Sequence, residues 1–448
     1  MVQDKICVHP WSHLNINPNG DVWPCCHQRG KNIYVLGNMH EKTIEEIYNA
    51  EPMRKLRTQM MQGILPEDVC GKCIEYEKLN MYSPRMEANR QVYAPEVMQQ
   101  ISNTNANGSV KDYKIRYWDL RWSNKCNMAC IMCDPDWSSL WTQQIKTNLE
   151  NFTDDTIQSE TILRRFKAKA KQKVLHVPNN GWIDQHIEHV EFIYFAGGEP
   201  LIMDEHWYIL DKLHKLKKHS VRLKYNTNMS KLEHFGKNAI DYWKHWQPGK
   251  LSVEGSIDET GTRAEYIRYG TNWQQVENNI KTLVEAGIKT QANASIGCYN
   301  VMRLPELLEE LWELYKPKKP NSNVKINLNP VLNGWCRCEV LPDEWKQNVK
   351  QKLIKLQNSN TIPITRMEKI LYELDRPHKP ESVDWLFKQI SFLDLNKHTT
   401  LLKAIPEMSK LNDMYGGLYE KYKNEWIKKS VDKRNSGVDS NLCSSIHN

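Results

Sequence analysis

The 448-residue sequence lacks any uninterrupted run of about 18 apolar residues, the length that a membrane-spanning helix requires. Its first residues, MVQDKICVHPWSHLN, lack the charged start and apolar core of a secretory signal. It has no internal repeat, and its net charge of +7 is too small to identify an anionic partner. We therefore expect a soluble, cytoplasmic protein with no membrane partner.

Cysteine, by contrast, is abundant and clustered. In a reducing compartment, the 12 cysteines are more often metal ligands or catalysts than disulfides. Three of them, Cys126, Cys130 and Cys133, lie within the eight residues of CNMACIMC. Tetrahedral zinc and cubane iron–sulfur clusters take four ligands. These three thiols therefore leave one coordination position for another group.

The middle of the chain alternates strand-like and helix-like segments, the pattern of βα units around a parallel sheet. Six such units favour a partial (β/α)₆ barrel over a closed barrel of eight strands. The predicted strands are KIRYWDLRW (114–122), VEFIYFAG (190–197), VRLKYNTN (221–228), KLSVEGSID (250–258), KTQANASIG (289–297) and VKINLNPV (324–331).

The flanking regions differ from this pattern. The first region has two strand-like stretches around a turn, in LNINPNGDVWPCC, and one predicted helix over 43–63. The predicted divisions are a small Cys-rich domain over 1–95, a linker over 96–112, the barrel over 113–340, a helical extension over 341–430 and a flexible tail over 431–448. Within the barrel we expect an insertion over about 141–188, which contains a basic run at 163–173.

Polar motifs follow the predicted strands at the points where they end. The cysteine triplet follows the first strand, FAGGEP the second, NTNMS the third, GSIDETG the fourth and SIGCYN the fifth. Because parallel βα folds bind ligands at the carboxyl ends of their strands, these motifs are expected to share one site.

With these motifs the sequence resembles the radical S-adenosylmethionine (SAM) enzymes. Their CxxxCxxC signature is matched by Cys126, Cys130 and Cys133, and their GGEP-like segment by residues 197–200. The resemblance implies that the three thiolates hold a [4Fe–4S] cluster, whose fourth iron binds the amino and carboxylate groups of SAM. It also implies reductive cleavage of SAM to a 5′-deoxyadenosyl radical, which abstracts a hydrogen atom from substrate. A one-electron reductant such as flavodoxin or ferredoxin would then be a partner.

The resemblance also implies which residues contact SAM. Glu199 offers an acceptor for the ammonium group, and its neighbouring glycines let the backbone approach closely. Met132 stands where the family often has an aromatic residue, and a thioether can pack near the adenine. The complete predicted set is Met132, Gly197, Gly198, Glu199, Pro200, Asn226, Ser256, Asp258 and Arg268.

A second cysteine set resembles the auxiliary-cluster domains called Twitch or SPASM, here placed before the barrel. Its predicted ligands are Cys7, Cys25, Cys70 and Cys73, with Cys26 as the alternative to Cys25. Four thiolates complete a cubane, so such a second [4Fe–4S] cluster would suit electron transfer or structural support. A zinc ribbon is the alternative, since CxxC pairs also build these sites.

Three further cysteines follow predicted strands. Cys298, at the end of the fifth strand, is either a hydrogen-atom donor to a substrate radical or a buried structural residue. Cys336 and Cys338, beyond the sixth strand, either line the mouth of the barrel or ligate a further cluster.

The predicted function is therefore a radical SAM enzyme that modifies a peptide or protein. A dehydrogenase or epimerase acting on a small carbohydrate or nucleotide is the first alternative, and a non-enzymatic zinc or iron–sulfur protein is the second. Nucleic acid is not favoured as a partner, because the basic run at 163–173 contains only one aromatic residue, Phe166.

Overall fold

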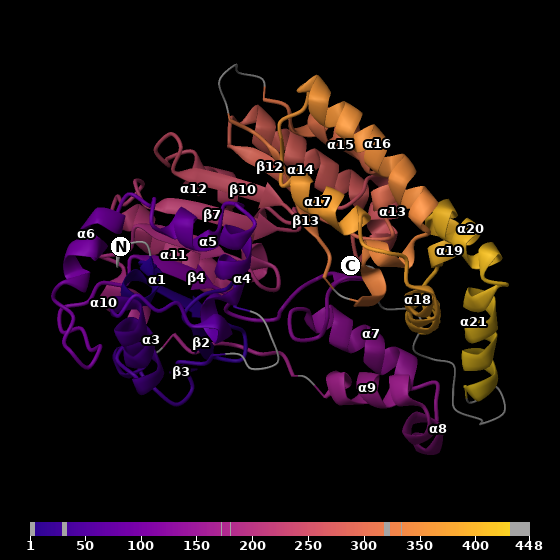
Figure 1. The fold of residues 1–448 in the computed structure, drawn as a ribbon, viewed down its shortest axis with the longest axis horizontal. Coiled ribbons are helices and arrows are strands. Elements are labelled where there is room, and N and C mark those ends of the chain that lie inside the picture. The colour runs from indigo at the N-terminus through magenta and orange to yellow at the C-terminus, as the bar shows by residue number, and fades with distance from the viewer. Residues whose placement is uncertain are drawn as a thin grey trace.

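The fold is built around an open ten-stranded sheet (Figure 1). The computed structural model describes residues 5–28, 34–171, 173–179, 181–317, 323–332 and 334–430. Six parallel strands occupy adjacent positions in the sheet, in the order β13-β12-β10-β7-β6-β4. Their bounds are β4 (Tyr117–Leu120), β6 (Phe192–Phe195), β7 (Arg222–Thr227), β10 (Leu251–Gly255), β12 (Thr290–Ile296) and β13 (Ile326–Pro330). All six predicted strands and the predicted fold class are confirmed.

The N-terminal hairpin continues this sheet. Strand β1 (His13–Ile16) pairs in parallel with β4, and β2 (Asp21–Trp23) and β3 (Gly37–Asn38) follow it in antiparallel order. At the opposite edge, β14 (Ile364–Thr365) pairs in parallel with β13. The predicted hairpin is confirmed, whereas its parallel pairing with β4 was not predicted. A short local pattern cannot reveal a partner about 100 residues away in the chain.

The two faces of the sheet differ in polarity. Along β7, Leu223 and Tyr225 are buried, whereas Arg222, Lys224 and Asn226 are half-buried. Alternation with a period of two places these sets on opposite faces. The helices between the strands cover the apolar face (Figure 1): α11 (Asp204–Lys215), α12 (Ala239–Trp243), α14 (Trp273–Glu285), α15 (Leu304–Tyr315) and α16 (Asp343–Ser359). The polar face is left for the site.

Five short helices surround the N-terminal hairpin: α2 (Ile44–Tyr48), α3 (Glu51–Met61), α4 (Glu67–Lys78), α5 (Pro84–Ala88) and α6 (Ala94–Ile101). The prediction of one continuous helix over 43–63 is wrong, because the chain breaks between α2 and α3. Ala50 adopts an extended conformation (ψ 155°), and Pro52 stands in the first turn of α3. Proline lacks an N–H and is tolerated only at the start of a helix, so it ends the first helix and begins the second.

The region that we interpret as an insertion contains α7 (Ser139–Leu149), α8 (Asp154–Ser159), α9 (Thr161–Ala170) and α10 (Trp182–His186). Helices α7 and α9 lie beside the C-terminal helices, whereas α10 lies on the other side of the molecule, near α3 (Figure 1). Phe166 of α9 stacks on Phe392 of α18 (Pro380–Leu393), with ring centroids 4.7 Å apart, and Trp426 of α21 (Leu418–Lys429) meets Phe392 edge-on. These segments, distant in sequence, therefore share one apolar core.

None of the helices in the described part of the chain combines the length and apolarity needed to cross a bilayer. The predicted flexible tail, 431–448, lies outside the described residues.

Candidate functional site

The loop that carries the first cysteine triplet is fixed by its own neighbours. It follows β4 and contains the two-residue strand β5 (Ala129–Cys130). Trp141 Nε1 of α7 donates a hydrogen bond to the Cys130 carbonyl over 2.6 Å, and Ser138 Oγ donates to the Met128 carbonyl over 2.5 Å. The Cys133 amide donates to the Cys130 carbonyl over 2.9 Å. The N-terminal end of helix α7 thus holds the loop.

The three thiols of this loop lie close enough to affect one another. Burial, with a smaller contribution from the nearby thiol of Cys130, raises the pKa of Cys126 to about 12. Burial is also the main reason that the pKa of Cys133 is raised, with smaller contributions from Cys126 and Cys130. A metal that replaces these protons would therefore bind soft thiolate ligands.

A second short strand supports the loop from the other side. Strand β11 (Arg268–Tyr269) pairs antiparallel with β5, so that Arg268 lies opposite Cys130. Arg268 Nη1 donates to the Cys130 sulfur over 3.5 Å, and Nη2 lies 2.8 Å from the Asp258 carboxylate. Its buried Nε has no hydrogen-bond partner among the described residues. This arrangement leaves one guanidinium donor for a bound group.

The GGEP segment packs directly against the cysteine loop. Gly198 has φ +49°, and a Cβ at this position would lie 2.3 Å from the Lys125 carbonyl oxygen. The Glu199 amide donates to the same carbonyl over 2.9 Å. Glycine is therefore required at 198 both for its backbone conformation and for this close approach.

The Glu199 carboxylate is buried and held by three donors. Its Oε1 accepts from Thr227 Oγ1 over 2.7 Å and from the Leu201 amide over 3.1 Å, and its Oε2 accepts from the Asn228 amide over 2.7 Å. The side chain is 1% exposed, and burial raises its pKa to about 7. A carboxylate has about four acceptor sites, so one remains for a ligand.

The structure brings part of the predicted SAM set together. The cysteine loop, Glu199 and the Arg268–Asp258 pair meet at the carboxyl ends of β4, β6 and β10. Pro200 begins a buried 3₁₀ turn beside Glu199, while Ser256 and Met132 are half-buried.

Asn226 and Cys298 have different surroundings. With its side-chain O and N exchanged, the orientation that satisfies both groups, Asn226 accepts from Tyr194 Oη over 2.7 Å and donates to Glu254 over 3.1 Å, on the polar face of the sheet. Cys298 is 1% exposed and lies in the apolar core with Cys336 and Cys338; its amide donates to the Cys336 carbonyl. The structure does not bring Cys298 into contact with the other site residues.

Sequence reasoning missed Asn127 and Ser230, which join the cysteine loop to the end of the third strand. Asn228 Nδ2 donates to Asn127 Oδ1 over 2.8 Å, and Asn127 Nδ2 donates to Ser230 Oγ over 2.9 Å. Thr227, which binds Glu199, was missed as well. The only signal in the sequence was the run of polar residues, NTNMS, at the end of the strand.

Four thiols of the second cysteine set line one cavity: Cys7, Cys25, Cys70 and Cys73. The cavity floor is apolar, with Leu56, Met60 and Val69 among its lining residues. Cys26 is absent from this lining and interacts with Asp119 and Arg121 on the barrel side. The Cys25 and Cys26 thiols also interact with each other, but of the two only Cys25 lines the cavity.

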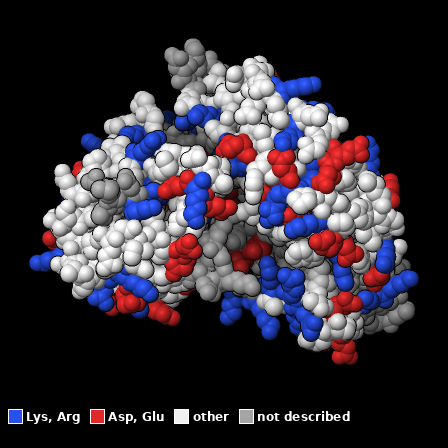
Figure 2. All heavy atoms as spheres, in the orientation of Figure 1, with Lys and Arg blue, Asp and Glu red and all other residues white. Residues whose placement is uncertain are grey.

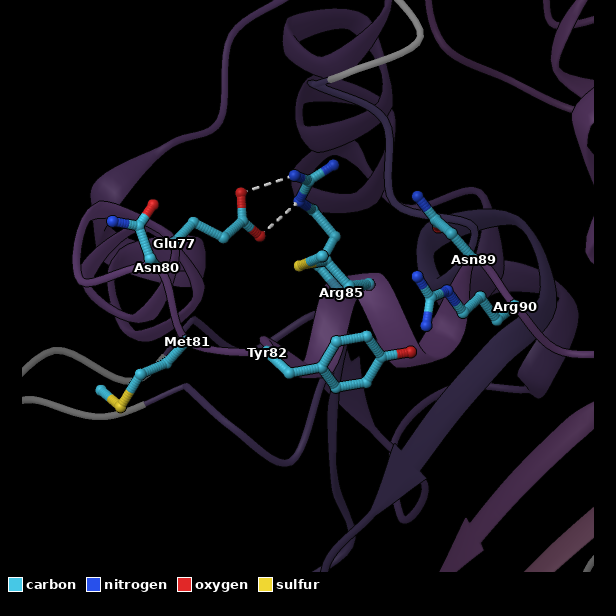
Figure 3. A pocket seen from close by; sticks show the side chains of 8 residues that line it. Glu77, Asn80, Met81, Tyr82, Arg85, Asn89 and Arg90 are labelled. Carbon is cyan, nitrogen blue, oxygen red and sulfur yellow. Dashed lines mark hydrogen bonds and ion pairs between the residues drawn. The ribbon is translucent and has the colours of Figure 1, made fainter. Parts of the chain in front are cut away.

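Arg85 is shared by the cysteine cavity and a pocket on the surface. That pocket also contains Tyr82 and Arg90 (Figure 3). The guanidinium forms two hydrogen bonds with the Glu77 carboxylate, of 3.1 and 2.6 Å, and donates to the Ile6 carbonyl over 2.9 Å.

Both thiol sets fit iron–sulfur clusters in number and residue type, although no three such side chains among the described residues are already arranged to hold a metal ion. Three thiols on one loop beside Glu199 and Arg268 suit a cluster with an open iron, and four thiols around one cavity suit a closed cluster. Burial raises the pKa of Cys7 to about 12, so the metal-free thiol carries no charge at neutral pH.

Comparisons with known proteins agree with this division of the site. The model for the radical SAM superfamily matches residues 120–316, and that for an iron–sulfur cluster-binding domain, SPASM, matches residues 7–74. No curated protein matches the chain.

Several solved structures resemble the chain at low similarity. One is native anSMEcpe with bound AdoMet, at 16% identity, covering 55% of this chain and 63% of that chain with a TM-score of 0.33. SuiB of Streptococcus suis bound to S-adenosylmethionine has 12% identity, coverages of 66% and 60%, and a TM-score of 0.38. SuiB bound to the precursor peptide SuiA has 12% identity, coverages of 91% and 78%, and a TM-score of 0.36.

This chain covers 63%, 60% and 59% of the length of three solved anSMEcpe structures, which is less than two thirds of each. Since these likenesses are weak, the assignment rests on the two family models. Members of the first family use a [4Fe–4S] cluster and SAM, and the second domain binds iron–sulfur clusters. Residues 120–316 therefore belong to the radical SAM superfamily, and residues 7–74, at the N-terminal end, form a SPASM domain.

Proposed function

We propose that this chain reductively cleaves SAM and abstracts a hydrogen atom from a peptide or protein substrate. The observation that carries the proposal is the contact of the cysteine loop with both Glu199 and Arg268 at one edge of the sheet. When bound, the cluster and SAM supply the one-electron chemistry, and the protein supplies binding, orientation and exclusion of water.

In this proposal Cys126, Cys130 and Cys133 hold the SAM-binding cluster. The free acceptor site of Glu199 would take the SAM ammonium, and Arg268 Nε would donate to the SAM carboxylate. Asn226, bound to Tyr194 on the polar face, would contact SAM from the substrate side. The remaining proposed SAM contacts are Met132, Gly197, Gly198, Pro200, Ser256 and Asp258.

We assign the second cluster to Cys7, Cys25, Cys70 and Cys73. A cubane with four protein ligands has no open iron, so its role would be electron transfer or support. The reductant would be a one-electron carrier such as flavodoxin or ferredoxin. Arg85, which lines both the cavity and the surface pocket, is consistent with electron exchange at this surface (Figure 3).

Unpartnered polar groups at the junction of β1 and β4 support a peptide substrate. Asn17 Oδ1 and Arg121 Nε are buried and have no hydrogen-bond partner among the described residues. The Arg121 amide donates to the Ile16 carbonyl over 3.0 Å, so the two residues stand on neighbouring parts of the backbone. One free donor and one free acceptor complement the C=O and N–H groups of a peptide.

The first alternative, a small carbohydrate or nucleotide, is favoured by a second set of groups on the polar face. Glu254 accepts from Gln291 Nε2 over 2.9 Å and lies 3.1 Å from Lys224 Nζ. Such a network also suits hydroxyl groups. RNA has less support. Lys and Arg side chains gather over the region of α7 and α9 (Figure 2), but Phe166 is buried against Phe392 and offers no surface for base stacking.

The experiment that tests the function is anaerobic reconstitution followed by addition of SAM and dithionite. The wild type should form 5′-deoxyadenosine, and the Cys130→Ala variant should form none. A library of deuterated peptides then tests the substrate class, because deuterium should enter the nucleoside from a peptide that is a substrate. Cleavage stimulated only by carbohydrates or nucleotides would favour the first alternative, and absence of cleavage by loaded wild type would contradict the enzyme.

A further inference from the structure

The C-terminal helices, which neither family model covers, place a buried carboxylate behind the site. Asp394 follows α18 and is 1% exposed. Tyr266 Oη lies 3.0 Å from both of its oxygens, Tyr419 Oη donates to it over 3.0 Å, and the Leu401 amide donates over 2.8 Å. Three polar groups from separate parts of the chain therefore converge on one carboxylate.

Lys397 completes this group with a buried cation. Its side chain is 2% exposed, and Nζ lies 3.4 Å from Asp394 Oδ1. The same ammonium lies over two aromatic rings, 4.9 Å from the centroid of Tyr266 and 5.4 Å from that of Tyr269. Cation–π contacts of a desolvated lysine are stronger than exposed ones, so Lys397 holds both tyrosines.

These two tyrosines flank the segment that supports the cysteine loop. Between them, the Ile267 carbonyl accepts from the Ile131 amide over 2.9 Å, and Arg268 lies opposite Cys130. Movement of Tyr266 would therefore be transmitted to β11 and, through its backbone, to the loop.

The turn at the end of α18 also binds α7, which is the second element that supports the cysteine loop. The Phe392 carbonyl accepts from Asn148 Nδ2 over 2.8 Å, and the Leu393 carbonyl accepts from Gln144 Nε2 over 3.1 Å. Asn396 Nδ2 donates in turn to Asn148 Oδ1 over 2.8 Å. Helix α18 lies against α7 (Figure 1), and the first turn of α7 binds the loop.

We propose that residues 392–397, the C-terminal clamp, are a positioning element for the loop of Cys126, Cys130 and Cys133. The clamp fixes β11 through Tyr266 and α7 through Asn148, so that both sides of the loop are held by one turn. The cofactor that the loop holds rests on the proposed function. The claim that the clamp keeps the metal-free loop ordered does not. Outer partners of metal ligands typically affect metal affinity or activity by about 10- to 100-fold.

The test uses two matched variants of the full chain, Tyr266→Phe and Tyr419→Phe. Each removes one hydroxyl from the same carboxylate, but only Tyr266 continues into β11. In metal-free protein, hydrogen exchange of the peptide that contains residues 126–133 should be about tenfold faster in Tyr266→Phe and unchanged in Tyr419→Phe. After reconstitution, Tyr266→Phe should bind SAM about tenfold more weakly.

The clamp would be overturned if hydrogen exchange of this peptide were equal in the two variants, or if Tyr266→Phe exchanged at the wild-type rate. This holds even if both variants unfold at a lower temperature than the wild type. If Tyr266→Phe fails to fold, Gln144→Ala removes a single bond on the α7 side and should also speed exchange in the loop. A wild type that holds no iron would contradict the proposed function, and the exchange experiment would still decide on the clamp.

Discussion

Among single residues, Glu199 gives the proposed SAM site its pH dependence. Burial raises the pKa of its carboxyl group to about 7, and only the ionised form attracts the SAM ammonium. As the pH falls through 7, protons compete with SAM, so affinity should fall by up to about tenfold per pH unit. Equilibrium binding to reconstituted protein between pH 5.5 and 7.5 measures this effect.

The control for this prediction is Glu199→Gln, which should bind SAM weakly and with little pH dependence over the same range. A wild type whose affinity is constant from pH 5.5 to 7.5 would show that Glu199 does not contact the ammonium.

The neighbouring cysteines 25 and 26 give a second residue-level prediction. Cys25 lines the cavity of the auxiliary thiols and Cys26 does not. Cys25→Ser should therefore lose about four irons per chain after reconstitution, whereas Cys26→Ser should keep them. The reverse result, measured by iron analysis, would assign Cys26 as the ligand. The sequence alone could not decide between these residues. They are adjacent, so their distances along the chain from the other cysteines differ by only one residue.

At the scale of elements, the turn after β6 depends on glycine at 198. Gly198→Ala would place a Cβ 2.3 Å from the Lys125 carbonyl, in a left-handed conformation. The clash should cost about 1–3 kcal/mol in the free energy of unfolding beyond the conformational cost. Gly236→Ala isolates that conformational cost, since Gly236 has φ +77° and no neighbouring atom within 4 Å. Equal losses in denaturant titrations of the two variants would contradict the close packing.

The elements of the barrel could be predicted from the sequence because their patterns are local. The alternation of strand-like with helix-like segments located all six central strands, and the motifs at their ends located the cysteine loop and Glu199. The pairing of β1 with β4 depends on residues about 100 positions apart, and Thr227 and Asn127 act through contacts between loops. Such contacts have no local pattern and required the structure.

At the scale of the whole molecule, the insertion and the C-terminal helices depend on a shared core around Phe392. Removal of this fully buried ring, which stacks on Phe166, should destabilise the protein by about 3–5 kcal/mol. Tyr372→Ala is the control, because that ring is 60% exposed and should contribute little. Thermal unfolding of Phe392→Ala that matches the control would mean that these helices are stabilised independently.

The proposal that the chain binds two separate clusters is tested most directly by counting iron and sulfide after anaerobic reconstitution. Three proteins are compared: the wild type, a Cys126/Cys130/Cys133→Ala variant and a Cys7/Cys70/Cys73→Ala variant. The account predicts about eight irons and eight sulfides per chain in the wild type and about four of each in either variant. Zinc in place of iron, or loss of all iron in both variants, would contradict two independent clusters.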